Sequence, residues 1–358
     1  MRIFVALSLL TLLGCGAKTG LPVPENTTCR EIELERPVPQ VLFAVDRSGS
    51  MDFSLTGIEP DDPRRGDTPS RWTLMSAALT GSLAERTGTL EFGALFYPEI
   101  LPGDASACGG GEVVSIVPGE GTPEGLRSIF ESTVPIGGTP TGGALRVARE
   151  FFAEPEEGTV PFVVLVTDGA PNCNPEPATP PPACICTSPD PTRCDPVDNT
   201  DAALQCLDAT RALDELNMLS SAGVPTFVLG ITRQADLVQV LDDMAVAGGR
   251  PRTTGPRRYY DAQTEAELNE ALDAINDSIT SCAFTLSAPS NADRFQVLLA
   301  GSPITRDRSH MSGWDFTNDT NTVISLYGEA CRQAEDLGIE VRAELYCDDM
   351  SPEMERDI

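Results

Sequence analysis

The segment "VDRSGSM" (45–51) places one carboxylate and two hydroxyl groups at alternate positions directly after an apolar run. In a chain that leaves a strand, positions i, i+2 and i+4 can point the same way. The oxygen atoms of Asp46, Ser48 and Ser50 could therefore converge on one point. A site made only of oxygen ligands suits a hard cation such as Mg²⁺.

Two other segments offer the further oxygen ligands that such a cation needs. They are "GGTPTGGAL" (137–145) and "VTDGAPN" (166–172), which lie just beyond expected strands or at an expected helix start. Capping of a turn and a helix would explain Asp46 and its two serines. It would not explain three such segments, so the sequence favours a metal site.

Short apolar runs alternate with amphipathic stretches from about residue 39 to residue 281, which is typical of a parallel sheet covered by helices. In a doubly wound sheet, the loops at the carboxyl ends of the strands share one edge, where ligands bind. We expect six strands and at least four helices. The strands are 41–45, 90–97, 112–117, 161–168, 224–231 and 257–262, and helical spacing of apolar residues is found in 72–79, 145–152, 204–216 and 268–275.

The three segments, in this order, resemble the metal ion-dependent adhesion site (MIDAS) of von Willebrand factor type A (VWA) domains. Its pattern is D-x-S-x-S, then a threonine, then an aspartate. Thr139 fits the threonine better than Thr141 because it directly follows a pair of glycines. The residues that match the pattern are Asp46, Ser48, Ser50, Thr139 and Asp168.

The resemblance covers about residues 38–281 and implies an α/β, Rossmann-like VWA domain with a mostly parallel central sheet and helices on both faces. It also implies one Mg²⁺, with Mn²⁺ as a possible substitute, held directly or through water. An open metal position would take an acidic group of a protein or glycan partner. Two insertions, 52–71 and 171–201, depart from the family pattern beside this edge, so the partners of better-known members do not carry over.

The two ends of the chain have hydrophobic patterns that differ from those of this domain. Alternation with period two predicts a small β-rich module over 282–350, with one short helix around 329–336, followed by an acidic tail at 351–358. Residues 1–14 read as a signal peptide, because an apolar run of eleven residues is too short to span a bilayer. An asparagine-rich stretch at 315–321 reads as a polar turn rather than a calcium loop.

"LLGC" (12–15) looks like a bacterial lipobox, in which Cys15 becomes the lipidated N-terminus and 15–37 form a tether. An ordinary secretory signal with a chance cysteine is the alternative. Gly16 follows the cysteine, which by resemblance to a bacterial sorting rule indicates the outer membrane. We therefore expect a lipid-anchored protein of the bacterial cell envelope, on either its periplasmic or its surface side.

The cysteine count agrees with export, because the 11 cysteines less Cys15 leave ten, an even number that can form disulfides. Zinc is the rival reading for Cys173, Cys184, Cys186, Cys194 and Cys206, but this stretch has no histidine and no repeated C-x2-C. The termini of a VWA domain lie close together, which implies the pair Cys29–Cys282. Cys331 and Cys347 would then pair with each other, and Cys108 would join the five cysteines of the insertion.

The net charge and the histidine content argue against nucleic-acid binding and against catalysis. A net charge of -29 repels nucleic acid and anionic lipid. The single histidine, His310, lies outside the expected domain, and the chain has no G-x-S-x-G or H-E-x-x-H motif. We expect a non-enzymatic, Mg²⁺-dependent ligand-binding or adhesion lipoprotein. The alternative is an envelope assembly or scaffold component in which the metal is mainly structural.

Overall fold

A computed structural model describes most of the chain between residues 28 and 346. The described residues are 28–86, 88, 90–99, 108–109, 113–154, 159–188, 190–231, 235–252, 255–286, 294–317, 320–335 and 339–346. The expected signal peptide, Cys15 and the acidic tail lie outside them.

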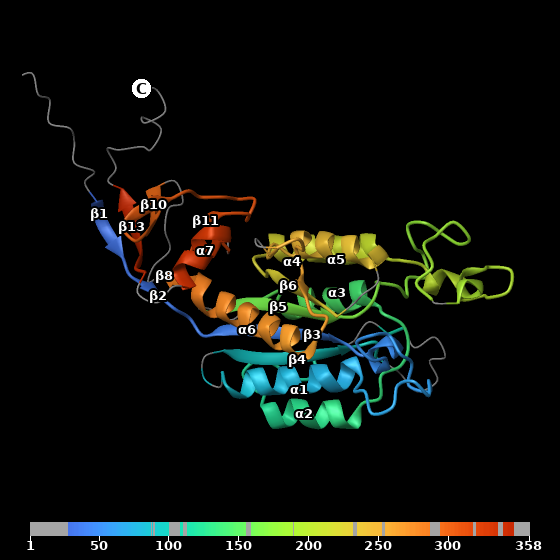
Figure 1. Cartoon of the computed structure of the whole chain (residues 1–358). Helices are drawn as coiled ribbons and strands as arrows, with labels where there is room; N and C mark the ends of the chain where they lie inside the picture. The colour runs from blue at the N-terminus through green and yellow to red at the C-terminus, as the bar shows by residue number, and fades with distance from the viewer. Residues whose placement is uncertain are drawn as a thin grey trace, which may run out of the picture.

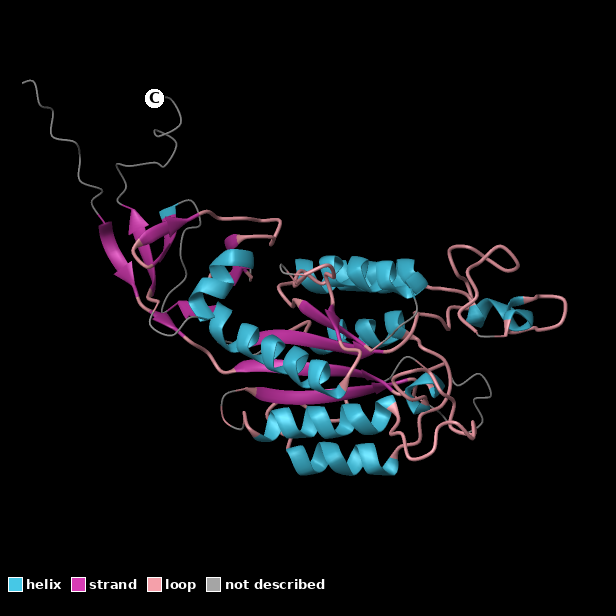
Figure 2. Ribbon diagram, viewed as in Figure 1, coloured by secondary structure: helices cyan, strands magenta, loops and turns pink. Residues whose placement is uncertain are grey.

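Five parallel strands form the central sheet, in the order β4-β3-β5-β6-β7. The expected fold class, a mostly parallel sheet with helices on both faces and a smaller β-rich part, is confirmed (Figures 1 and 2). The strands are β3 (Pro39–Asp46), β4 (Glu91–Tyr97), β5 (Val160–Thr167), β6 (Thr226–Gly230) and β7 (Tyr260–Asp261).

Alternate residues of strand β3 are buried in two separate apolar cores, one on each face of the sheet. Val41, Phe43 and Val45 join the core under α1 (Arg71–Ala84), α2 (Pro123–Ser132) and α6 (Glu265–Cys282). Leu42 and Ala44 join the core under α3 (Thr141–Phe151), α4 (Ala209–Ser221) and α5 (Ala235–Ala247). Burial on both faces explains the unbroken apolar run in this strand.

The segment 112–117, predicted to be a strand, is not one in its described part. Ala94 exchanges hydrogen bonds with Ile116, and the Ser115 amide also donates to the Ala94 carbonyl, but the pairing does not continue. Pro118 follows, has no N–H to extend a ladder, and lies against Gly93. The sheet therefore has five strands where the sequence predicts six.

The second part of the molecule contains two four-stranded antiparallel sheets, in the orders β1-β13-β9-β10 and β11-β12-β8-β2. One helix, α7 (Gly328–Glu335), lies where the sequence predicts it. The strands are β1 (Thr28–Ile32), β2 (Leu34–Glu35), β8 (Ala283–Leu286), β9 (Phe295–Leu299), β10 (Ser302–Ile304), β11 (Gly313–Phe316), β12 (Val323–Tyr327) and β13 (Val341–Tyr346).

Residues 28–35, expected to belong to a tether, instead complete this second part. β1 pairs with β13, and β2 pairs with β8. Ile32 is buried in the same apolar cluster as Trp314 and Phe295. The expectation was wrong because strand pairing across some 300 residues leaves no periodic trace in so short a segment.

Two predicted disulfides are also wrong, because Cys282 is bonded to Cys331. Cys29–Cys282 and Cys331–Cys347 therefore cannot form. Cys282 ends α6, and α6 packs against α7, which carries Cys331. Packing of two helices brings these cysteines together, with Cα atoms 5.2 Å apart.

The insertion is stabilised by disulfides, as predicted, and its cysteines are not available for zinc. Cys184 pairs with Cys206, and Cys186 pairs with Cys194. Cys108 pairs with Cys173, so it does join the insertion's cysteines. Among the described helices, none is long and apolar enough to cross a membrane.

The Cys282–Cys331 bond should appear as a linked peptide pair in non-reducing peptide mapping. Replacing both cysteines by serine should lower the free energy of unfolding by about 2–4 kcal/mol, because the bond closes a loop of 49 residues. Removing Cys186 and Cys194, which are eight residues apart, should have a smaller effect. A linked Cys29–Cys282 peptide would contradict the pairing.

Candidate metal centre

The three polar segments meet at the carboxyl edge of the sheet. β3 ends at Asp46, and Asp168 follows the last residue of β5, the strand paired with β3. Asp46 is fully buried. Its Oδ1 accepts a hydrogen bond from the Ser48 amide (2.8 Å), and its Oδ2 accepts one from the Thr167 hydroxyl (2.7 Å). Both carboxylate oxygens are thus held in place by the chain.

A short 3-10 helix, η1 (Gly49–Asp52), turns the two serines to the same side. Ser48 is the residue before it, and the Ser48 and Ser50 hydroxyl oxygens lie 3.1 Å apart. Ser50 Oγ donates to Asp168 Oδ1 at 2.8 Å. The D-x-S-x-S segment therefore reaches the aspartate of the third segment directly.

Backbone hydrogen bonds dock the loop before α3 onto the first segment. The Gly49 amide donates to the Gly137 carbonyl (3.1 Å), and the Ile136 amide donates to the Arg47 carbonyl (2.9 Å). This places Thr139 beside the serines. A Cβ atom on Gly169 would lie 3.6 Å from Thr139 Oγ1 and 3.8 Å from Ser50 Oγ. Glycine at 169 leaves that space between the hydroxyls open.

The other threonine of this loop does not have the same surroundings. Thr141 is the first residue of α3 and is fully buried. Its hydroxyl lies 3.5 Å from the Thr139 carbonyl. The geometry thus agrees with the choice of Thr139, and the structure brings together all five residues singled out in the sequence.

Asn172 holds Thr139 in position, a role that sequence reasoning missed. The Thr139 amide donates to Asn172 Oδ1 (2.6 Å), and the Asn172 amide donates to the Thr139 carbonyl (2.9 Å). Asn172 Nδ2 also donates to Thr187 Oγ1 in the insertion (2.9 Å). Asn172 is the last residue of "VTDGAPN", but only the folded chain shows what it contacts.

The Cys108–Cys173 disulfide packs against the same loop. A Cβ atom on Gly138 would lie 2.4 Å from Cys173 Sγ and 3.4 Å from Cys108 Sγ. Only glycine fits at this position without moving the disulfide. The insertion is therefore linked to the candidate metal loop through both Asn172 and a covalent bond.

Arg71 is the second residue that the sequence analysis missed. Its Nη1 forms a salt bridge with Asp168 Oδ2, and both side chains are buried. Arg71 is the first residue of α1 and the last of the insertion 52–71. Nothing in its sequence context indicated a contact with a residue 97 positions away.

Two buried carboxylates beside each other make this edge strongly electronegative. Burial and the charge of Asp168 raise the pKa of Asp46 to about 7. Burial also raises the pKa of Asp168, and the Arg71 guanidinium opposes that shift. One arginine does not balance two carboxylates, so a further cation would lower the electrostatic energy of the site.

The donor set fits a small, hard divalent cation. The hydroxyls of Ser48, Ser50 and Thr139 and the carboxylates of Asp46 and Asp168 supply oxygen atoms only. The space at Gly169 lies between two of the hydroxyls. These five residues would hold the ion, and the ion would supply Lewis acidity toward an anionic group.

The raised pKa of Asp46 predicts a pH dependence in metal-free buffer. Between about pH 4 and pH 7 the unfolded chain loses the Asp46 proton while the folded protein keeps it, so the contribution of Asp46 to stability falls as pH rises. The Asp46→Asn variant lacks this proton. Its stability relative to the native protein should therefore rise over this range, by an amount on the order of a few kcal/mol.

Urea unfolding at several pH values measures this difference. Asp214→Asn, at an exposed position on α4, should show no such trend. A native-minus-variant difference that is constant between pH 4 and pH 7 would contradict the assignment.

No family model matches the chain, and no curated protein matches it. Among solved structures, it is similar to the PilB minor pilin from Streptococcus sanguinis, with 18% identity and a TM-score of 0.45 over 69% of this chain. The chain spans 62% of that pilin. Manganese-loaded TRAP protein from Plasmodium vivax is 17% identical, with a TM-score of 0.42 over 83% of this chain and 97% of its own.

The vWF domain of the type V pili tip protein Mfa5 from Porphyromonas gingivalis is similar to the same degree. It is 16% identical, with a TM-score of 0.41 over 68% of this chain and 95% of its own. At this level of similarity, the three proteins do not indicate what this chain binds.

Proposed function

We propose that this protein is a non-enzymatic, Mg²⁺-dependent ligand-binding or adhesion protein that binds an acidic group of a protein or glycan partner. The convergence of three hydroxyls and two buried carboxylates at the carboxyl edge of the sheet supports this proposal. A cation held mainly by neutral hydroxyls keeps enough positive charge to attract a carboxylate from a partner.

The surroundings of the site favour binding over catalysis. General acid–base chemistry needs a titratable group that is free to reach a substrate. The two titratable acids of the site, Asp46 and Asp168, are buried and are the proposed ligands of the cation. The one histidine of the chain, His310, stacks on Tyr327 of the second part, with ring centroids 4.5 Å apart, and contacts Asp315. Arg71 is buried against Asp168 and so is not free to bind a phosphate, and Arg47 of the first segment donates its Nε–H to the Pro98 carbonyl (2.8 Å).

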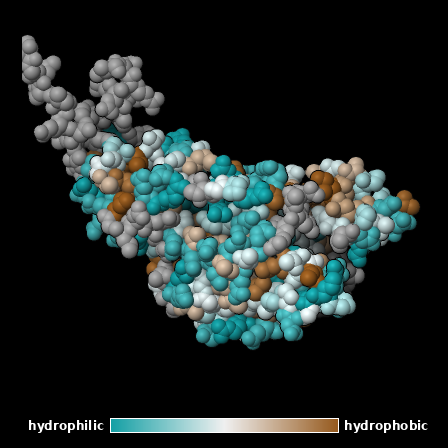
Figure 3. Space-filling view, in the orientation of Figure 1, coloured by the Kyte–Doolittle hydropathy of each residue, from teal (hydrophilic) through white to brown (hydrophobic). Residues whose placement is uncertain are grey.

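The same end of the molecule carries exposed apolar side chains that suit contact with a partner. Val134 and Ile136 precede the Thr139 loop and are 75% and 52% exposed. Ile185 and Val197 in the insertion are 64% and 88% exposed. Figure 3 shows apolar residues on this end, beside polar ones. Exposed apolar groups rimmed by polar residues often mark interaction sites.

Arg71 argues against the alternative of a mainly structural metal. It gives Asp168 a counter-ion that does not depend on metal, and the sheet beneath the site is packed with apolar side chains on both faces. We therefore propose that the fold persists without the cation and that the cation serves binding. The lipobox and the disulfides support placement in the bacterial cell envelope, with a lipid on Cys15 as the anchor.

Asp46→Ala should remove Mg²⁺ binding, measured by isothermal titration calorimetry, because Asp46 is the most deeply buried acid of the site. It should also remove Mg²⁺-dependent binding to a panel of carboxylate-bearing peptides and glycans. Val197→Asp should weaken partner binding but keep Mg²⁺ affinity, since Val197 lies on the exposed insertion. Asp214→Ala, a remote acid, should change neither.

The outcomes separate the two functions. Unchanged Mg²⁺ affinity in Asp46→Ala would refute the metal site. Partner binding that is indifferent to EDTA, together with a fold that melts at much lower temperature in EDTA, would favour the assembly or scaffold role.

Arg71→Met should increase Mg²⁺ affinity, because a positive charge next to the site is removed. In metal-free buffer the same variant should be less stable by about 3 kcal/mol or more, since Asp168 loses its buried partner. Added Mg²⁺ should therefore raise the melting temperature of Arg71→Met more than that of the native protein. Equal shifts in thermal melts would show that Arg71 does not compete with the cation.

A further inference from the structure

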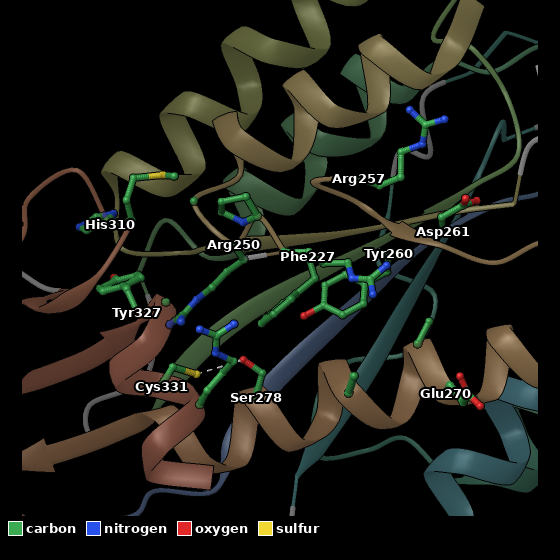
Figure 4. Close-up of a pocket in the computed structure, with 18 of the residues that line it drawn as sticks. Phe227, Arg250, Arg257, Tyr260, Asp261, Glu270, Ser278, His310, Tyr327 and Cys331 are labelled. Atoms are coloured by element: carbon green, nitrogen blue, oxygen red, sulfur yellow. Dashed lines mark hydrogen bonds between the residues drawn. The ribbon is translucent and has the colours of Figure 1, made fainter. Parts of the chain in front are cut away.

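A loop rich in arginine borders a cavity at the seam between the two parts of the molecule. The segment "GRPRTTGPRR" (249–258) holds four arginines, in a chain with 25 basic and 54 acidic residues. The cavity has a volume of about 580 Å³ and is lined by this loop, by α6 and by residues of the second part such as His310 and Tyr327 (Figure 4). Cavities of this size hold small organic ligands.

The cavity exists because the last strand of the central sheet is short. β6 pairs with Gly249 at Thr226 and with β7 at Leu229 and Gly230. Between these points the described residues of the arginine loop, 250–252 and 255–259, form no strand pairs with β6. Phe227, the second residue of β6, is part of the cavity wall, and its ring lies 6.1 Å from the ring of Tyr260 in β7.

Arg250 is a buried cation at the back of this cavity. It is 6% exposed, and burial lowers its pKa. Its guanidinium donates to the Leu326 carbonyl (3.0 Å) and to Ser325 Oγ (2.8 Å) and lies 4.5 Å from the centre of the Tyr327 ring. No carboxylate of the described residues forms an ion pair with it. A buried charge without a counter-ion is costly.

Two more arginines of the loop line the cavity without an ion-pair partner among the described residues, and Figure 4 shows Arg257 at the same end as Asp261, away from Arg250. Arg252 lies over the Tyr260 ring at 5.4 Å, and Arg257 lines the wall. The carboxylates of the cavity lie apart from Arg250. In Figure 4, Asp261 and Glu270 are drawn at the far end from Arg250 and Tyr327, and Glu267 and Glu270 are exposed.

We propose that this cavity binds a small organic carboxylate with an apolar body. A guanidinium group pairs with a carboxylate through two parallel hydrogen bonds. Apolar lining from Phe227, Ala271, Ala274 and Met311 suits a hydrocarbon part of the ligand. The acids at the far end disfavour a doubly charged phosphate more than a singly charged carboxylate.

The proposed site is separate from the candidate metal centre. Arg250 follows Gly249, which pairs with the first residue of β6, whereas Asp46 is the last residue of β3 and Asp168 directly follows β5. The two sites therefore lie toward opposite ends of parallel strands. Ligand binding in this cavity should not require Mg²⁺.

The test uses 2-naphthoate as probe, with 2-naphthamide as its neutral counterpart and inorganic phosphate as the competing anion. Calorimetry with the full-length protein should detect binding of naphthoate, and binding of the amide should be at least tenfold weaker. Arg252→Gln should weaken naphthoate binding about tenfold, because it removes a charged donor. Arg257→Gln should weaken it less, because Arg257 lies at the end of the cavity that holds Asp261. Neither side chain belongs to an apolar core of the molecule, so both variants should fold.

Arg146→Gln is the matched control, because it removes the same charge from an exposed residue of α3. It should leave naphthoate binding unchanged, and so should Asp46→Ala or EDTA. Equal binding of naphthoate and the amide would overturn the proposal, as would tighter binding of phosphate than of naphthoate. An equal loss in Arg146→Gln, or no binding by the native protein, would also overturn it.

Discussion

Burial of two carboxylates at one edge of a parallel sheet is the constraint around which the chain is arranged. Asp46 and Asp168 lie at the ends of neighbouring strands, and burial and mutual repulsion disfavour their charged forms. Hydroxyl and amide groups of nearby residues donate hydrogen bonds to the two carboxylates, and one buried arginine forms an ion pair with Asp168. The remaining excess of negative charge is what makes a divalent cation a favourable addition.

Arginine has opposite consequences at the two ends of the molecule. At the metal edge, Arg71 compensates an acid and limits how strongly the site attracts a cation. At the seam with the second part, Arg250 is buried without an acid among the described residues, and the adjoining cavity is open to an anion. A chain with a net charge of -29 thus concentrates positive charge where two parts meet.

Disulfides fix the segments whose positions the sheet does not determine. Cys108–Cys173 rests on Gly138, so it holds the insertion against the loop that carries Thr139. Cys282–Cys331 joins the last helix of the first part to α7 of the second. In Figure 1 the insertion and the second part lie at opposite ends of the central sheet. The first disulfide stabilises a loop, and the second is buried in the apolar cluster of the second part.

The sequence by itself indicated the parallel sheet and the D-x-S-x-S residues of the candidate site, because apolar runs and that spacing are local patterns read directly from neighbouring residues. Thr139 and Asp168, far along the chain, were singled out through the resemblance to a family pattern. The sequence did not determine the partners of Arg71 and Asn172, which depend on contacts between distant segments. The strands at 28–35 and the Cys282–Cys331 bond were mispredicted for the same reason. Which strand pairs with which, and which helices touch, is decided only when the whole chain packs.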